Sequence, residues 1–245
     1  MHIANHITDN FTNLKKLNHD YVKNPPYPNI GLDNFIPQDT VSAMKEECNN
    51  LDWTREFTRA GSYMKERMDV EDCPVALDVQ QQLSSKKFMT WLGKLTGHPD
   101  LVPDPHMVGA GYMRSGRGHS LKIHSDFNWN NTIKLWRLIS MTIYLNKDWQ
   151  EEWNGDLQFY DFDRTKCIKS YYPEAGRAVI WRHHKYGFHG HPNPMQCPEG
   201  VYRDGFRMFY YVSEFANVKT DDSPHRSLYW YDEKTKTPYD IPEEK

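Results

Sequence analysis

The sequence predicts a mostly β protein, an antiparallel sandwich or jelly roll, with supporting α-helices in its N-terminal part. The first observation is a series of short β-rich runs after about Pro105, namely SLKIHSD, LISMTIYLN, DLQFYDF, RAVIWR and FRMFYYV. Asn, Gly and Pro clusters separate these runs, and short strands at such a spacing are typical of sandwiches and barrels. The second observation is that apolar residues recur at helical spacing in the first hundred residues.

Two apolar stripes predict helices in this N-terminal part. The first stripe consists of Val41, Met44, Cys48 and Leu51. The second consists of Phe88, Trp91, Leu92 and Leu95. Asp39 is a possible cap before the first stripe, and Gly97 ends the second. We therefore expect one structural domain, with residues 1–104 as a helical support packed on the core, 105–216 as the jelly-roll core and 217–245 as a C-terminal tail or flap.

Charge and composition exclude several classes of protein. The chain has 245 residues with 30 basic and 33 acidic side chains, so the near balance favours neither a nucleic-acid nor a membrane partner. No run of eighteen apolar residues and no signal-peptide pattern occurs, which predicts a cytoplasmic protein. The four cysteines lie far apart and form no CxxC pair, so neither a disulfide framework nor a cysteine zinc site is expected.

A His-x-Asp motif in the run LKIHSDF raises the question of a metal site. Composition alone predicts about 1.6 chance occurrences of His-x-Asp/Glu in this chain, and two are present. The other, His98-Pro-Asp100, lies among Pro and Gly residues that predict a surface turn. At His124 and Asp126 the alternation with Leu121 and Ile123 predicts a strand that places both polar side chains on one face.

Two ligands at i and i+2 on a strand can bind one ion together with a third ligand from elsewhere. Two histidines and one carboxylate form the facial triad of non-haem Fe(II) oxygenases, which leaves adjacent coordination positions open. The third ligand should come from a later strand, and the candidates in WRHHKYGFHGHPNP are His183, His184, His189 and His191. Spacing alone does not choose among these four.

Six short motifs, taken in order, resemble the 2-oxoglutarate and Fe(II)-dependent oxygenases of the prolyl 4-hydroxylase type. They are HSDF, IYLNKDW, NGDLQFYD, PEAGRAVIW, FHGHPNP and RDGFRMFYY, and they cover about residues 105 to 215. Each motif is weak alone, whereas six in family order are specific. The resemblance implies a double-stranded β-helix (jelly roll, cupin-like) and the metal ligands His124, Asp126 and His189.

The resemblance also implies how the cosubstrate is bound. Arg203 matches the basic residue that pairs with the distal carboxylate of 2-oxoglutarate, and Tyr144 matches a tyrosine that hydrogen-bonds the same group. A tyrosine that many relatives have three residues before the first ligand is Leu121 here, and we expect Tyr112 to replace it. Arg207, which the relatives lack, should face the same pocket as Arg203 unless a bulge after Gly205 turns it outward.

The function implied is that of a dioxygenase that uses Fe(II), 2-oxoglutarate and O2, with ascorbate as a possible further cofactor. Such an enzyme hydroxylates an unactivated C–H bond, most often on a peptidyl proline, and releases succinate and CO2. The expected partner is a peptide, protein or small-molecule substrate, and neither nucleic acid nor a membrane. The alternatives are hydroxylation of a small metabolite or another amino-acid side chain, and a non-oxygenase cupin-like metal- or sugar-binding protein.

Overall fold

The computed structural model describes residues 2–53, 56–59, 62–67, 70–213, 224, 228–230 and 238–240. Side chains are not described for residues 54–69 or for the strands after residue 224. The helices are α1 (Ile3–Asn10), α2 (Leu14–Lys23), α3 (Gln38–Asn49), α4 (Pro74–Leu83), α5 (Lys86–Thr96) and the short 3-10 helix η1 (Glu151–Trp153). They lie mainly before residue 100, where the apolar stripes predict helix.

The strands form two antiparallel sheets. The large sheet contains β1 (Asn29–Leu32), β2 (Glu56–Arg59), β3 (Ser62–Arg67), β4 (Val102–Pro103), β5 (Gly111–Ser115), β7 (Trp129–Asn130), β8 (Leu135–Tyr144), β11 (Ala178–Arg182) and β13 (Arg203–Val212). The small sheet contains β6 (Leu121–Ser125), β9 (Leu157–Tyr160), β10 (Cys167–Tyr171), β12 (His189–His191), β14 (Leu228–Trp230) and β15 (Pro238–Asp240). Each of the five β-rich runs quoted from the sequence overlaps one of these strands.

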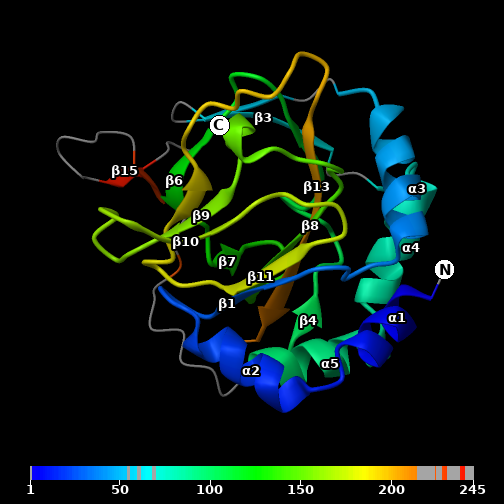
Figure 1. Ribbon diagram of the computed structural model, residues 1–245. Helices are drawn as coiled ribbons and strands as arrows, with labels where there is room; N and C mark the ends of the chain where they lie inside the picture. Colours follow the sequence, from blue (N-terminus) through cyan, green and yellow to red (C-terminus); the bar gives the residue numbers. More distant parts are fainter. Residues whose placement is uncertain are drawn as a thin grey trace.

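The order of strands gives the jelly roll that the sequence predicts. The large sheet runs β1-β11-β8-β13-β5-β3-β2 and the small sheet β10-β9-β12-β6-β14-β15, so strands far apart in the sequence are neighbours (Figure 1). A buried apolar cluster joins the inner faces of the two sheets, and it consists of Tyr27, Tyr144, Leu157, Phe159, Val179 and Trp181. The candidate ligands lie beside this cluster, between the sheets.

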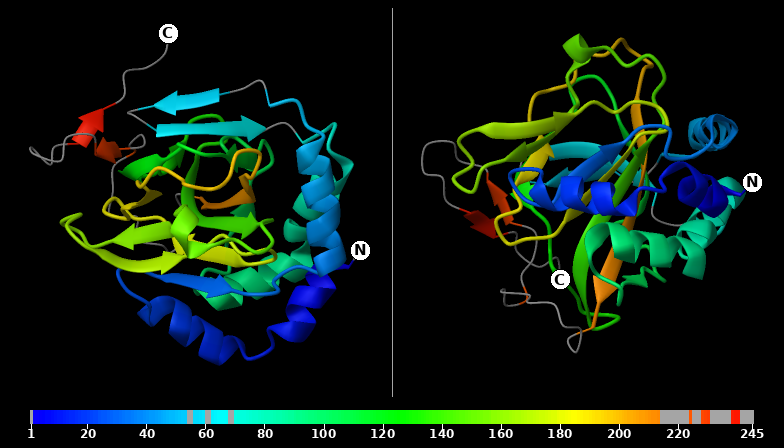
Figure 2. Two further views of the ribbon diagram at one scale, coloured as in Figure 1. Left: turned by 45° about the horizontal axis from the view of Figure 1, so that its top comes forward. Right: turned by 60° about the horizontal axis from the view of Figure 1, so that its bottom comes forward.

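The helices pack on the outer face of the large sheet, and they stay on that side in two further views (Figure 2). Phe88 of α5 contacts Tyr210 of β13, with ring centroids 6.1 Å apart, and the Tyr210 hydroxyl donates to the carbonyl of Leu83. The Ser85 side chain caps α5. Gly97 ends the helix with φ 78°, and this end is the one that the sequence predicts. The prediction of a cap at Asp39 is wrong, because α3 begins at Gln38 and Asp39 lies in its first turn.

The first hundred residues contribute strands as well as helices, which the periodicity did not predict. Asn29 to Leu32 pair with β11 at one edge of the large sheet, and β2 and β3 pair with each other and extend the opposite edge through β5. An edge strand of four residues is too short to show a clear alternation. Its conformation depends on a partner strand about 150 residues later, which no local pattern reveals.

A buried ion-pair network fastens α3 to the large sheet. Asp204 of β13 is fully buried, and its carboxylate receives Arg114 Nε at 2.7 Å and Arg114 Nη2 at 2.8 Å. Lys45 of α3 pairs with the same carboxylate from the helix side. Arg114 and Asp204 are both buried whereas Lys45 is partly exposed, and the loss of Asp204 would leave both cations without their acid.

The remaining features of the chain bear on its surface and its end. Strand β14 pairs with β6, with Tyr229 opposite His124, while most of the predicted tail 217–245 lies outside the described residues.

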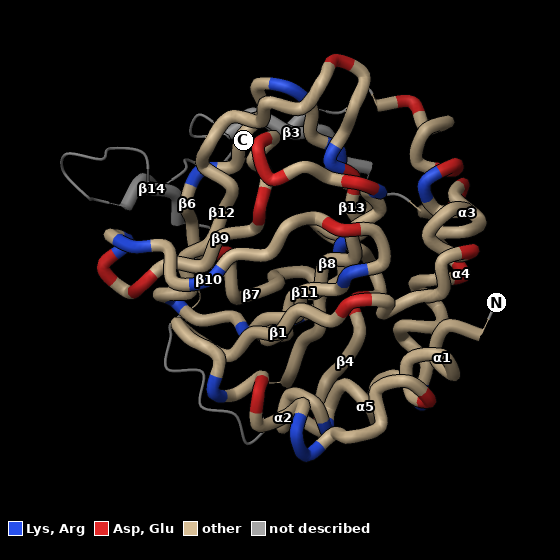
Figure 3. The backbone as a smooth tube through the Cα atoms, in the orientation of Figure 1, with Lys and Arg blue, Asp and Glu red and all other residues tan. Residues whose placement is uncertain are grey.

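All four cysteines are free thiols, as predicted. Basic and acidic residues are interspersed along the described backbone (Figure 3). Within the described ranges, every helix is too short or too polar to span a membrane.

We predict that Asp204→Asn lowers the free energy of unfolding by about 3 to 5 kcal/mol, because it leaves the buried Arg114 and the partly exposed Lys45 without their acid. Denaturant unfolding followed by circular dichroism measures this change. The control is Asp33→Asn, which removes an ion pair with Arg177 from a side chain that is 63% exposed. Exposed pairs contribute about 1 kcal/mol or less. Equal effects of the two substitutions would contradict a structural role for the buried network.

Candidate metal and cosubstrate site

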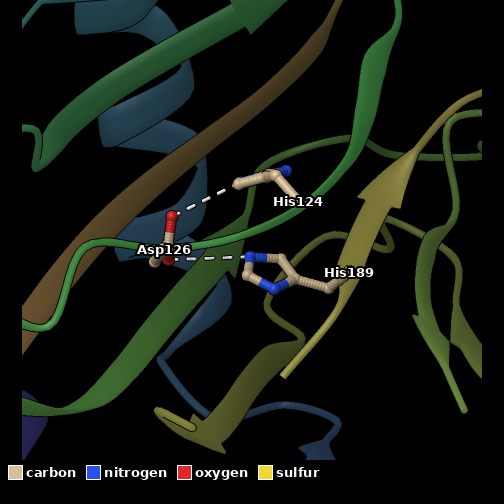
Figure 4. Close-up of side chains that lie close together, drawn as sticks. All are labelled: His124, Asp126 and His189. Carbon is tan, nitrogen blue, oxygen red and sulfur yellow. Dashed lines mark ion pairs between the residues drawn. The ribbon is translucent and has the colours of Figure 1, made fainter. Parts of the chain in front are cut away.

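His124, Asp126 and His189 lie together between the two sheets (Figure 4). One potential ligand atom from each of the three lies within 4.8 Å of the other two. His124 Nε2 is 3.3 Å from one oxygen of Asp126, and His189 Nε2 is 3.6 Å from the other. The antiparallel pairing of β6 with β12 places His189 directly opposite His124, and Asp126 follows one residue after β6 ends.

The backbone selects the nitrogen that each histidine turns toward Asp126. His124 Nδ1 lies 2.8 Å from the carbonyl oxygen of Lys122, and His189 Nδ1 lies 2.9 Å from that of Gly187. A carbonyl only accepts, so both Nδ1 atoms carry the hydrogen. In the neutral ring Nε2 then has the lone pair, and it faces the shared carboxylate, which is the arrangement that a metal ion requires.

The surroundings hold His189 and Asp126 in ligand-competent protonation states. Burial and, to a smaller extent, the neighbouring His124 lower the pKa of His189 to about 4, so the ring is neutral. Burial raises the pKa of Asp126, but Arg137, His124 and His189 outweigh it and hold the pKa well below its usual range. Trp181 and Phe159 lie against His189, with ring centroids at 5.3 and 6.2 Å. An anionic carboxylate and the neutral imidazole of His189 thus meet in an apolar interior.

Arg137 and His183 also approach Asp126. Arg137 was not predicted to be part of the site, and His183 was one of the four histidines that spacing left open. Arg137 Nη2 lies 3.5 Å and His183 Nε2 3.7 Å from the Asp126 oxygen that faces His189. His183 Nε2 is also 2.5 Å from the hydroxyl of Ser140. The guanidinium of Arg137 stacks 3.1 Å from the centroid of the Phe209 ring, and burial lowers its pKa to about 10.

A register shift explains why Arg137 was missed. Phe209 pairs with Ser140 and Tyr210 with Ile139, but Tyr211 pairs with Arg137, so one residue of β8 is skipped. Strict alternation would turn Arg137 to the helix side, whereas the bulge turns it inward. A charged residue inside the run LWRLISMTIY was the available sign of a buried ion pair.

The other histidine candidates separate clearly in the structure. The turn that holds His98 and Asp100 lies outside both sheets, as predicted. His184 lies in the loop after β11, where its ring contacts Tyr186 at 5.6 Å between centroids. His191 is buried in β12, two residues after His189, but is not part of the group of three that could hold a metal ion.

Arg203 and Tyr144 form a second polar cluster in the same interior. Arg203 Nη2 donates to the Tyr144 hydroxyl at 3.0 Å, and its Nε donates to the carbonyl of Gly155 at 2.6 Å. These two bonds leave the third guanidinium nitrogen, Nη1, for another acceptor. Burial raises the pKa of Tyr144 more than the charge of Arg203 lowers it, so the phenol keeps its hydrogen. Together the two side chains present donors suited to a carboxylate.

The turn before β9 is shaped to receive Arg203. Asn154 and Gly155 have φ of 58° and 83°, so an asparagine occupies the first left-handed position as predicted. A Cβ at Gly155 would come 3.2 Å from the Cδ of Arg203 and 3.0 Å from the Sδ of Met195. Glycine at this position therefore permits both the turn and the contact with the arginine.

Tyr112 lies on the wrong face of the large sheet for a cosubstrate contact. It pairs with Phe206, and both side chains point toward the helices. Its hydroxyl donates to the carboxylate of Glu47 at 2.7 Å. The same carboxylate accepts the backbone N–H groups of Val75 and Ala76 at the start of α4. This placement contradicts the prediction that Tyr112 contacts the cosubstrate, because residues of β5 that share a face with Arg203 are Ser115 and Met113.

Arg207 lies on the same face of β13 as Arg203. The pairing with β8 is continuous from Gly205 to Tyr210, so the bulge that could have turned Arg207 outward is absent from this described stretch. The guanidinium lies 5.5 Å from the Phe209 ring centroid, and its charge lowers the pKa of Arg137. Two arginines thus flank Phe209 on the side of the metal candidates.

Comparisons with known proteins agree with this geometry. Residues 110–211 match the model of the 2OG-Fe(II) oxygenase superfamily. No curated protein sequence matches the chain significantly.

Solved structures share the fold at low sequence identity. A prolyl-4-hydroxylase from Pseudomonas putida is 15% identical with a TM-score of 0.54, covering 82% of this chain and 99% of that chain. A prolyl hydroxylase from Trichoplax adhaerens, in complex with a hypoxia inducible factor peptide fragment, is 16% identical with a TM-score of 0.55, covering 83% and 93%. HygX from Streptomyces hygroscopicus, with nickel, 2-oxoglutarate and hygromycin B bound, is 12% identical with a TM-score of 0.51, covering 76% and 83%.

The matched segment contains His124, Asp126 and His189 as well as Tyr144 and Arg203. Residues 110–211 are therefore similar to the 2OG-Fe(II) oxygenase superfamily, and the solved structures share the fold.

Proposed function

We propose that this protein is an Fe(II)- and 2-oxoglutarate-dependent dioxygenase that hydroxylates a peptidyl proline, with Fe(II) held by His124, Asp126 and His189. The observation that carries the proposal is the convergence of two imidazole Nε2 atoms and one carboxylate in an apolar interior that also contains the Arg203–Tyr144 pair. Two histidines and one carboxylate form the donor set that suits non-haem Fe(II). The prolyl hydroxylases among the similar structures support proline as the target.

Each residue has a defined task in this proposal. Bound Fe(II) would supply the chemistry by which O2 and 2-oxoglutarate give succinate and CO2 while a C–H bond of the substrate is hydroxylated. Tyr144 and Arg203 bind the distal carboxylate of 2-oxoglutarate and so orient its keto acid end. Arg137 keeps Asp126 ionised and oriented. Phe159 and Trp181 exclude water from the side of His189.

A second candidate function is hydroxylation of a small molecule that carries an acidic group. Arg137 and Arg207 bring two guanidinium groups to the rings around the metal candidates, and such groups bind carboxylates well. HygX shows that this fold also occurs with a small molecule bound. The non-oxygenase cupin alternative has no such support, since the family match indicates an oxygenase. A cytoplasmic location stays a prediction.

The direct test of the substrate is a screen for mass gain of one oxygen. Proline-containing peptides, cell-extract proteins and acidic metabolites are incubated with the Fe(II)-loaded enzyme and 2-oxoglutarate, and succinate is quantified in parallel. We expect oxygen gain on proline that matches succinate release. Gain on an acidic metabolite alone would replace the proline proposal with the second candidate.

We predict that His124→Ala and Asp126→Ala each abolish Fe(II) binding and 2-oxoglutarate turnover, because each removes one of three ligands. Calorimetric titration with Mn(II) measures metal affinity, and succinate release measures turnover. His98→Ala and Asp100→Ala form the matched control from the second His-x-Asp motif. Changes in such a turn are usually near-neutral, so we expect both activities within about twofold of wild type. Equal losses at the two motifs would refute the assignment.

We predict that His189→Ala is as damaging as His124→Ala, whereas His184→Ala is nearly silent. His183→Ala should fall between them, because it removes a neighbour of Asp126 without removing a ligand. The same Mn(II) titration ranks the three variants. A ranking in which His183 or His184 matters more than His189 would show that the third ligand has been misassigned.

We predict that Arg203→Ala raises the KM for 2-oxoglutarate by about tenfold or more, since a hydrogen bond to a charged group contributes roughly 1.5 to 3 kcal/mol. Arg207→Ala should spare this KM and uncouple succinate release from substrate hydroxylation. Tyr144→Phe, which removes the hydroxyl that Arg203 contacts, should also raise this KM. Tyr112→Phe is its matched control, because it removes a hydroxyl on the helix side of the sheet. If Arg207→Ala raises the KM and Arg203→Ala does not, the roles of the two arginines are exchanged.

A further inference from the structure

His191 is a buried polar side chain that has no role in the proposed iron site of His124, Asp126 and His189. Its side chain is 1% exposed, yet within the described part of the chain neither Nδ1 nor Nε2 has a hydrogen-bond partner. A buried polar group without a partner destabilises the folded state by about 1 to 3 kcal/mol. Buried polar groups in native proteins are nearly always paired, so both nitrogens of His191 call for an acceptor or donor that the chain itself does not supply.

The strand places His191 on the face that holds the metal candidates. His189 pairs with Phe159, whose ring is in the inner apolar cluster, and Gly190 pairs with Gln158 on the other face. The next residue, His191, therefore turns back to the interior. On its other side it pairs with the buried Leu121, at a register shift relative to His124.

Strand pairing places the ring between the two polar clusters. On one side Gly190 pairs with Gln158, three residues after Gly155, whose carbonyl accepts a hydrogen bond from Arg203 Nε. On the other side β12 pairs with β6, which carries His124. Besides burial, the charges of Arg203 and His124 lower the pKa of His191, which agrees with this placement. A neutral imidazole carries one N–H and a protonated one carries two, so His191 offers a donor toward this space in either state.

Two simpler explanations fit less well. A core histidine would be expected to bond a neighbouring carbonyl, as His124 and His189 do through Nδ1. A fourth metal ligand would have to join the group of three, and His191 does not. An anion between Arg203 and His124 would satisfy the orphaned nitrogen and would also be held by Arg203 Nη1.

We propose that His191 donates a hydrogen bond to the distal carboxylate of bound 2-oxoglutarate, as a third contact beside Arg203 and Tyr144. This inference rests on the proposed function of the site. It adds a cosubstrate-binding residue that neither the sequence motifs nor the metal geometry assigned. Because a carboxylate has about four lone-pair positions, three donors from three strands can be accommodated.

The test uses anaerobic calorimetry with the full-length protein loaded with Mn(II). Two keto acids are titrated, 2-oxoglutarate and 2-oxobutyrate, which lacks the distal carboxylate. We expect His191→Leu to weaken 2-oxoglutarate binding about tenfold or more, as for the loss of a hydrogen bond to a charged group, and to leave 2-oxobutyrate binding within about twofold. His191→Gln keeps an N–H donor and should restore most of the affinity. His98→Leu, at a histidine outside the site, should change neither.

The outcomes separate the inference from the function on which it rests. Equal weakening of both keto acids by His191→Leu, or no weakening of either, would overturn the contact with the distal carboxylate. Loss of Mn(II) binding in His191→Gln would show that His191 is a metal ligand, which also overturns it. If the wild-type protein binds Mn(II) but neither keto acid, the proposed function fails rather than the assignment of His191.

Discussion

The antiparallel pairing of β6 with β12 is the constraint on which the site depends. It sets His189 opposite His124, and the two carbonyls that orient the rings belong to residues two positions before each histidine. Both ligands are therefore positioned by backbone geometry within a few residues, and not by long side-chain networks. Structures that share the fold at 12 to 16% identity show that such sheets form from very different sequences.

The large sheet contributes the electrostatic half of the site. A carboxylate in an apolar interior would favour its protonated form, and a protonated Asp126 would be a poor ligand. Arg137 prevents this, at the cost of burying a guanidinium whose pKa falls to about 10. The ring of Phe209 covers one face of that cation, which partly replaces its hydration. The bulge in β8 turns Arg137 inward and so permits its ion pair with Asp126. A local irregularity in the large sheet thus stabilises a candidate ligand that follows β6 of the small sheet.

Sequence periodicity was sufficient for the helices α3 and α5 and for the strand that carries His124 and leads to Asp126, because such patterns depend on local burial alone. It was insufficient wherever the outcome depended on which strands pair and in what register. Tyr112 was misplaced because the face of β5 follows from its pairing with β13, where Ser115 lies opposite Arg203. Arg137 was missed for the related reason that one skipped residue reverses the face. Spacing left four histidines open as the third ligand, and only tertiary placement distinguishes His189 from its neighbours.

The inner face of β13 carries the proposed cosubstrate anchor Arg203 near one end and Arg207 farther along. Arg203 and Arg207 are separated on this face by Gly205 alone, and Tyr144 and Thr142 lie opposite Gly205 and Arg207. A Cβ at Gly205 would come 3.3 Å from Thr142 Cγ2 and 3.3 Å from the Ile143 carbonyl oxygen. The strand therefore has its smallest residue between the anchor and the second arginine, where a bound keto acid would extend toward the metal. Beyond this point the inner face presents Arg207, Phe209 and Arg137, and of these three side chains Arg137 is tied to the metal candidates by its ion pair with Asp126.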